Sequence, residues 1–379
     1  MPYFFRYTLI LALCVSVFLA RVDLALAESS CAAPAFLVKG VQVEAESVSG
    51  DEARKIAMNM GIEKSWQRLR SRLLLEPISD MDEIGTEDIS NLIDYTRLVR
   101  ETVLSKRYLA EFDYCFDRDL VRAYFKDTSQ QHAELVSGRI LILPVWNIPG
   151  QPRIWRQPNH WLEAWRDELS GHDGLVSLSL PKNLATERAV EAEAIAKGEA
   201  KMIATAARME KAERVIITTI TPALAESGDG QALNMNAKAR LYNRNGKLVS
   251  EFYSLNDMLL PANKAEKTLK WLSSEIIDTI EDVWRKTNVL AHEPVASVGI
   301  FIPVNDVEAW AEALKTIEGL APVHSVAVIH VAAEGGLLRV NLNSSMRSLN
   351  YALETVGLMV KPGPDPAGGE RLNLLPLDK

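Results

Sequence analysis

The hydrophobic and polar positions divide the chain into three stretches, each of which mixes strand-like and helix-like patterns. Alternation with period 2 predicts strands, and a repeat near 3.6 predicts helices. The elements expected in the first stretch are a strand at 37–45, a helix at 51–74, a short helix at 87–94 and a hairpin that pairs 97–103 with 107–116. Residues 28–127 are therefore predicted to form a small α+β domain.

The second stretch follows a polar segment, 127–137, that is typical of a linker. Residues 139–146 form a continuous apolar run, the pattern of a buried central strand. We expect beyond it a helix at 160–169, a strand at 175–180, a long helix at 187–211, a strand at 214–221, a hairpin that pairs 233–242 with 247–255, and a helix at 262–286. The last helix carries an apolar stripe of Leu269, Leu272, Ile276, Ile280 and Val283. Residues 138–290 are predicted to form a central α/β domain.

The third stretch, residues 294–361, has the order βαββαβ. This is the order of the ferredoxin-like fold, which hosts many unrelated functions. The tail at 362–379 is rich in Pro and Gly at its start and is expected to be flexible. Its apolar segment 372–377 either adds a strand to a partner's sheet or docks on its own domain. The predicted fold class is thus α/β and α+β, in three small modules.

The first 27 residues carry the pattern of a secretory signal peptide. Arg6 precedes an apolar run at 9–20, and the segment ends in Ala25-Leu26-Ala27. The run has 12 residues, whereas a membrane-spanning helix needs about 20. Cleavage after Ala27 is therefore favoured over an uncleaved anchor, and no transmembrane span is expected in the mature chain. These features predict a soluble periplasmic protein.

The cysteines fit export to a compartment that permits disulfides. Cys14 leaves with the signal peptide, so Cys31 and Cys115 are the one possible pair. Cys115 lies on the polar face of its expected strand, where a thiol needs a structural reason. A Cys31–Cys115 disulfide is the favoured hypothesis, and two separate structural thiols are the alternative.

Composition and motifs exclude several classes of function. The chain has 379 residues and a formal net charge of −8, without a local basic patch, so no nucleic-acid partner is expected. The usual hydrolase, zinc-protease, nucleotide and dinucleotide motifs are missing from the sequence. Its six histidines are dispersed, without a pair at metal-ligand spacing. We therefore assign no catalytic residue, metal or cofactor.

The most distinctive local feature is a cluster of aromatic residues. Four of the eight tryptophans fall within a window of 20 residues, next to cationic side chains. The candidate binding residues are Trp146, Arg153, Trp155, Arg156, His160, Trp161 and Trp165. One hypothesis is an aromatic platform for a glycan, peptide or apolar ligand. The other is that the rings fill the join between a strand and a helix, because aromatic residues at helical spacing usually pack inside a protein.

Several of these segments resemble one family. The opening strand-helix-hairpin unit, the strand Leu143-Pro144-Val145-Trp146, the segment 159–165 with Trp155 before it, and the final βαββαβ unit with Gly357-Leu358 resemble the exported bacterial proteins grouped as domain of unknown function 2066. The resemblance covers most of the mature chain. It implies a cell-envelope context and no activity or catalytic residue.

Together these patterns predict a soluble, non-catalytic periplasmic protein that binds or organises cell-envelope components, with an envelope protein as the favoured partner. The alternative is a small-ligand or glycan binder, or an enzyme, with its site at the Trp-rich segment 146–165. A concave pocket that holds Trp155, His160 and Trp165 would support the alternative.

Export and cleavage can be tested on the protein as the cell makes it. We expect the mature chain to begin at Glu28, because Ala25 and Ala27 supply the small residues that signal peptidase requires. Intact mass spectrometry and N-terminal sequencing of the purified protein would check this. Retention of residues 1–27 would instead support the uncleaved anchor.

Overall fold

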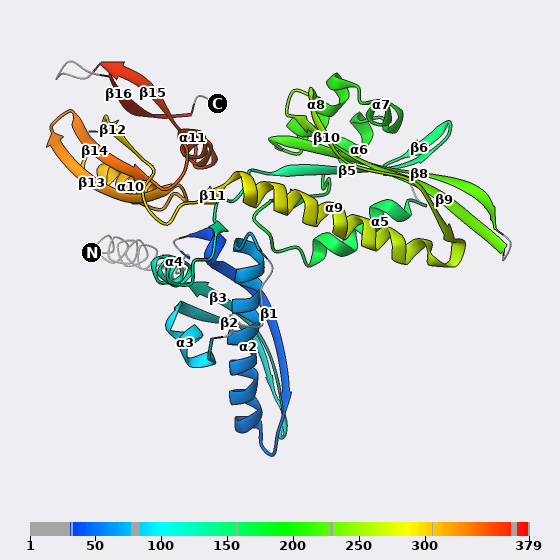
Figure 1. The fold of residues 1–379 in the computed structure, drawn as a ribbon, viewed down its shortest axis with the longest axis horizontal. Helices are drawn as coiled ribbons and strands as arrows, with labels where there is room; N and C mark the ends of the chain where they lie inside the picture. The colour runs from blue at the N-terminus through cyan, green and yellow to red at the C-terminus, as the bar shows by residue number, and fades with distance from the viewer. Residues whose placement is uncertain are drawn as a thin grey trace, which may run out of the picture. The chain divides into compact units, whose positions relative to one another are not determined.

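The computed structural model describes residues 31, 33–76, 84–155, 158–227, 230–304, 306–364 and 370–377. The predicted signal peptide, residues 1–27, lies outside these ranges. Residues 33–379 belong to one compact unit. The described part of this unit holds sheets of three, six, two and five strands, together with helices (Figure 1). This mixture confirms the expected α+β organisation in several small sheets.

The first sheet has the strand order β1-β3-β2, and helix α2 lies along it (Figure 1). The elements here are η1 (Pro34–Phe36), β1 (Leu37–Glu46), α2 (Gly50–Leu73), α3 (Thr86–Asn91), β2 (Ile93–Val103), β3 (Arg107–Phe116) and α4 (Arg118–Asp127). Helix α2 begins at Gly50 because the Ser49 hydroxyl accepts a hydrogen bond from the Glu52 amide at 3.2 Å. Helix α4 was not predicted, although Asp117 caps its start in the usual way.

The central sheet has the order β10-β9-β8-β5-β6, with β7 beside β5. Its module consists of β5 (Ile140–Ile148), β6 (Gln151–Arg153), α5 (His160–Ser170), β7 (Leu178–Ser179), α6 (Leu184–Ala189), α7 (Ala192–Lys197), α8 (Ala200–Met209), β8 (Arg214–Ser227), β9 (Gly230–Asn243), β10 (Leu248–Pro261), η3 (Ala262–Lys264) and α9 (Ala265–Thr287). Ile140 and Ile142 of β5 pack with α5 and α9, whereas Leu141 and Leu143 pack with α7 and α8 on the other face (Figure 1). Because both faces are covered, this strand is apolar at successive positions, as expected.

The prediction of one long helix at 187–211 is wrong. The segment forms three short helices, α6, α7 and α8. Helix α7 ends at Gly198, whose φ of 76° lies in the left-handed region that favours glycine. A Cβ at this position would also lie 3.1 Å from the Tyr242 hydroxyl. The break escaped prediction because Ala and Glu favour helix on both sides of it.

The C-terminal sheet has the order β13-β14-β12-β16-β15. Its elements are β12 (Ala296–Ile302), α10 (Val307–Glu318), β13 (Val323–Ala332), β14 (Gly335–Leu342), α11 (Met346–Thr355), β15 (Leu358–Pro364) and β16 (Glu370–Pro376). The expected βαββαβ order is present. The prediction of a flexible tail is wrong for residues 370–376, which form strand β16. Strand β16 pairs in parallel with β12 and antiparallel with β15. It therefore separates two strands that a four-stranded ferredoxin-like sheet would place side by side, and the docking of the apolar tail on its own domain is confirmed.

Within the segment 127–137, residues 132–135 and 137 are buried, so the prediction of a polar linker is wrong for its second half. Strand β4 (His132–Ala133) pairs with β11 (Val289–Leu290). Glu134, which is 3% exposed, accepts two hydrogen bonds from Arg122 at 2.7 Å each. The same guanidinium donates to the Ala321 carbonyl at 3.0 Å. Polar composition did not mean exposure here, because the buried carboxylate has a buried cationic partner.

Cys31 and Cys115 are both disulfide-bonded. Since the chain has three cysteines, these two are each other's partners, as predicted.

No helix in the described ranges has the length and apolar character needed to cross a membrane.

The Glu134–Arg122 pair makes stability depend on pH. Burial raises the pKa of Glu134, but the Arg122 guanidinium and a hydrogen bond from His132 outweigh burial and lower the pKa from 4.5 to about 2. A carboxyl group whose pKa is lower in the folded protein than in the unfolded protein stabilises the fold at pH values above its pKa in the unfolded protein. This contribution is lost as the pH falls toward the pKa of the folded protein. We expect Glu134→Gln to cost roughly 3 kcal/mol of unfolding free energy at pH 7.

Urea unfolding of the wild type and Glu134→Gln between pH 7 and pH 2 would check this expectation. The difference between the two proteins should shrink as the pH falls below 4.5. Glu293→Gln is the matched control, because Glu293 pairs with Lys126 on the surface. A constant difference across the whole pH range would contradict the assignment.

Candidate functional site

Two of the candidate tryptophans belong to the core. Trp161 and Trp165 lie on α5 and are 0% exposed. Their rings meet edge to face with centroids 5.7 Å apart. The Trp161 indole Nε1 donates a hydrogen bond to the Thr218 hydroxyl at 3.0 Å. These contacts confirm the packing hypothesis for this pair.

The other candidate residues do not join them. Trp155 packs in the core on the opposite face of the central sheet, and its Nε1 donates to the Val190 carbonyl at 3.0 Å. Trp146 packs on the same face as α5 and meets the exposed His160 ring at 6.1 Å. Arg153 donates to the Pro158 carbonyl at 3.1 Å. Arg156 lies outside the described residues. The sheet therefore separates Trp155 from Trp161 and Trp165. Two cavities formed by the described residues contain none of the candidate residues in their linings.

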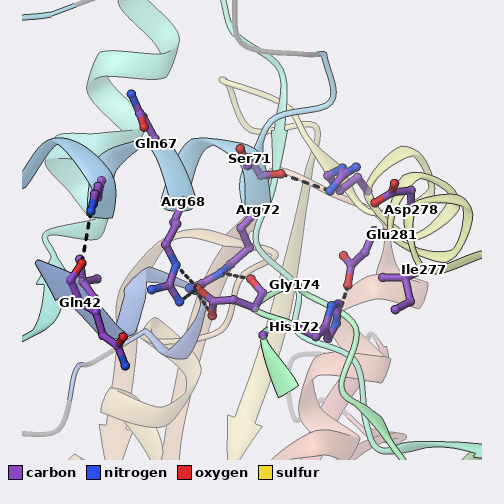
Figure 2. A pocket seen from close by; sticks show the side chains of 15 residues that line it. Gln42, Gln67, Arg68, Ser71, Arg72, His172, Gly174, Ile277, Asp278 and Glu281 are labelled. Carbon is purple, nitrogen blue, oxygen red and sulfur yellow. Dashed lines mark hydrogen bonds and ion pairs between the residues drawn. The ribbon is translucent and has the colours of Figure 1, made fainter. Parts of the chain in front are cut away.

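The first cavity, the polar cleft, has a volume of about 610 Å³ and lies between α2, the loop 171–174 and α9 (Figure 2). Arg68 and Arg72 project from α2 toward the loop, and both bind the Asp173 carboxylate. Arg72 also donates from Nε to the Asp173 carbonyl at 2.8 Å and from Nη1 to the Ala35 carbonyl at 2.8 Å. Because its cations are held by groups of the same chain, this cleft works as a structural junction.

The α9 side of the polar cleft is held in the same way. The buried Glu281 carboxylate accepts hydrogen bonds from the Leu175 and Val176 amides at 3.1 and 3.0 Å. It also lies 3.2 Å from Nε2 of His172 (Figure 2). Burial lowers the pKa of His172, but the Glu281 carboxylate and the Val176 carbonyl outweigh burial and raise it. The loop is thereby fixed to α9.

The second cavity, the apolar cleft, has a volume of about 710 Å³. It lies between the central sheet, the C-terminal half of α9 and the first turn of α11. Its apolar lining consists of Ile140, Val176, Ile216, Leu241, Phe252, Ile280, Val283, Trp284 and Met346. Most of these side chains belong to the central core, but Val283 is 56% exposed. An apolar wall that opens to solvent is the usual form of a small-molecule site.

Trp284 and Tyr351 form the wall that joins α9 to α11. Their rings meet edge to face with centroids 5.5 Å apart. Trp284 Nε1 donates to the Leu135 carbonyl at 2.6 Å. The Tyr351 hydroxyl accepts from the Gly138 amide at 2.6 Å and donates to the Glu213 carboxylate at 3.1 Å. Burial and the Glu213 charge raise the pKa of Tyr351 to about 12 against the opposing Gly138 hydrogen bond, so the phenol stays protonated.

The charged groups of the apolar cleft are of one sign. Arg214 and Arg347 line it, and none of its lining residues is Asp or Glu. The remaining polar lining residues are uncharged: Ser250, Thr287, Asn288, Ser345, Ser348 and Tyr351. The site can therefore hold an apolar body together with an anionic group.

Sequence reasoning missed this site because its residues come from four strands and two helices and form no motif. One signal was present. Val283 is the last position of the predicted apolar stripe of α9. In the structure Leu269, Leu272 and Ile276 lie in the core, whereas Ile280 and Val283 line the apolar cleft. An apolar stripe that continues beyond the part of a helix packed on the sheet indicates that the helix has a second apolar surface.

No protein-family model matches the chain, and no curated protein matches it either. Among solved structures, the hypothetical protein CT253 from Chlamydia trachomatis is similar at 16% identity and a TM-score of 0.26, over 38% of this chain and 96% of that one. The lipoprotein GNA1162 from Neisseria meningitidis is similar at 18% identity and a TM-score of 0.26, over 38% of this chain and 97% of that one. At these values neither likeness carries an argument about this chain.

The polar cleft predicts a large cost for losing Asp173. The Arg72 side chain is 3% exposed, and removal of its counter-charge leaves a buried cation with backbone carbonyls alone. We expect Asp173→Ala to lower the free energy of unfolding by about 3 kcal/mol. Asp167→Ala is the matched control, because Asp167 pairs with Lys270 on the surface, where such a pair contributes under about 1 kcal/mol. Denaturant unfolding measures both, and equal costs would show that the buried pair has no special role.

Proposed function

We propose that this is an exported, non-catalytic protein of the cell envelope that binds an amphiphilic envelope component, with the apolar part of that component in the apolar cleft. The observation that carries the proposal is the cleft itself, about 710 Å³ in volume and lined by nine apolar side chains. Its volume falls within the range typical of small-molecule sites. The proposal keeps the envelope context and places the binding site away from the Trp-rich segment.

The physical driving force is the removal of apolar surface from water. Val283 is 56% exposed, and the indole of Trp284 is only partly buried. Each square ångström of apolar surface that a ligand covers contributes about 25 cal/mol before the cost of ordering the ligand. An apolar ligand fits this driving force because the sheet and α9 together supply eight of the nine apolar lining residues, if Val176 beside the sheet is counted with it.

The expectations that an envelope protein is the partner, and that the chain resembles the domain of unknown function 2066, stay predictions. They are compatible with the proposal, since an amphiphile carrier in the periplasm must receive or deliver its ligand at the envelope. No catalytic group is part of the proposal, because binding alone explains the lining of the apolar cleft.

Filling the apolar cleft tests the proposal. We expect Val283→Trp to weaken binding of the neutral apolar dye Nile red by at least about tenfold, because the added indole occupies the space of the ligand. A fluorescence titration of the mature protein measures this. Val307→Trp is the matched control, since Val307 is 81% exposed on another helix, α10.

Both variants should keep the circular dichroism spectrum and melting temperature of the wild type. Nile red binding that is equally strong in all three folded proteins would place the apolar ligand elsewhere and refute the proposal.

A further inference from the structure

We infer that the occupant of the apolar cleft is an acyl-chain amphiphile with an anionic head group, a carboxylate or a phosphate, bound by Arg214 and Arg347. This inference rests on the proposed function and specifies its ligand. The two arginines come from separate elements: Arg214 is the first residue of β8, and Arg347 is the second residue of α11. Their convergence on one cavity is produced by the fold.

The charge balance of the cleft favours an anion. The whole chain carries a formal net charge of −8, yet the residues that line this cavity include two arginines and no acidic side chain. Guanidinium groups bind carboxylates and phosphates through two parallel hydrogen bonds. The adjoining apolar wall lowers the local dielectric constant and strengthens such a contact.

The two arginines also have unused hydrogen-bonding capacity. Several polar groups around them are already paired within the chain. The Thr287 hydroxyl donates to the Val283 carbonyl at 2.6 Å, and the Asn288 amide donates to the Trp284 carbonyl at 2.9 Å. Neither Arg214 nor Arg347 has a side-chain ion pair in the part of the chain that the structure describes.

The carboxylate next to Arg214 in the sequence does not pair with it. Glu213 precedes Arg214 in the sequence, but its Oε2 accepts the hydrogen bond of the Tyr351 hydroxyl at 3.1 Å. Glu213 is absent from the lining of the apolar cleft, whereas Arg214 and Tyr351 belong to it. The cations of the cleft are therefore left for a ligand anion.

The test compares ligands that differ only in the head group. Palmitic acid, palmityl phosphate and palmityl alcohol are titrated against Nile red bound to the mature protein, below the aggregation threshold of each ligand. We expect the acid and the phosphate to bind about tenfold more tightly than the alcohol. Inorganic phosphate without an acyl chain is the fourth probe and should displace nothing, which separates an amphiphile from a free anion.

Variants then assign the head group to the arginines. Arg214→Gln and Arg347→Gln should each weaken the acid and the phosphate about tenfold and leave the alcohol within twofold of the wild type. Arg214→Lys keeps the charge without the planar fork and should lose less than Arg214→Gln. Arg244→Gln is the control, because Arg244 is exposed in the β9–β10 turn and does not line the cleft.

The outcomes separate this inference from the proposed function. If the alcohol binds as tightly as the acid, or if neither glutamine variant affects the acid, the anionic head group is overturned while apolar binding stands. If Nile red binding is also insensitive to Val283→Trp, the proposed function itself fails. Displacement by inorganic phosphate would convert the site to one for a free anion and would likewise overturn the inference.

Discussion

The contact of Trp284 at the end of α9 is the interaction on which the apolar cleft depends. This side chain packs against the core of the central sheet and also against the core of the C-terminal sheet. Its indole Nε1 donates to Leu135, and its ring meets Tyr351 of α11. A single residue thus fixes α9, the buried segment before β5 and α11 together, and the cavity is the space left beside that contact.

Buried polar pairs hold the other junctions, and they differ in kind from the apolar one. Arg122 joins Glu134 and carbonyls next to β13, while Arg72 joins Asp173 and carbonyls at the start of β1. A buried ion pair contributes little net free energy to folding compared with an apolar contact of the same size. Removal of one partner nevertheless destabilises the fold strongly, because it leaves an unpaired buried charge. Such pairs therefore favour one arrangement of the elements over others, whereas the apolar cleft remains open to a ligand.

Much of the fold could be predicted from the sequence, because local periodicity determines it. The apolar run at 139–146 became a strand covered on both faces, and the spacing of Trp161 and Trp165 became a buried pair. The errors arose where tertiary context decided. Gly198 breaks a helix-favouring segment through its positive φ, and strand β16 inserts between β12 and β15 through hydrogen bonds that no local pattern encodes.

The candidate site could not be predicted from the sequence, because tertiary contacts and no local pattern bring its residues together. Arg214 begins a predicted strand and Arg347 begins a predicted helix, and at either position an arginine normally lies in solvent. What makes them notable is the absence of an acidic neighbour in the lining they share, a property of the cavity and of no segment. Glu213, one residue before Arg214, is outside the lining, and its carboxylate accepts a hydrogen bond from the Tyr351 hydroxyl of α11. The positive charge of the cleft is therefore a property of residues that three-dimensional contacts between β8 and α11 bring together.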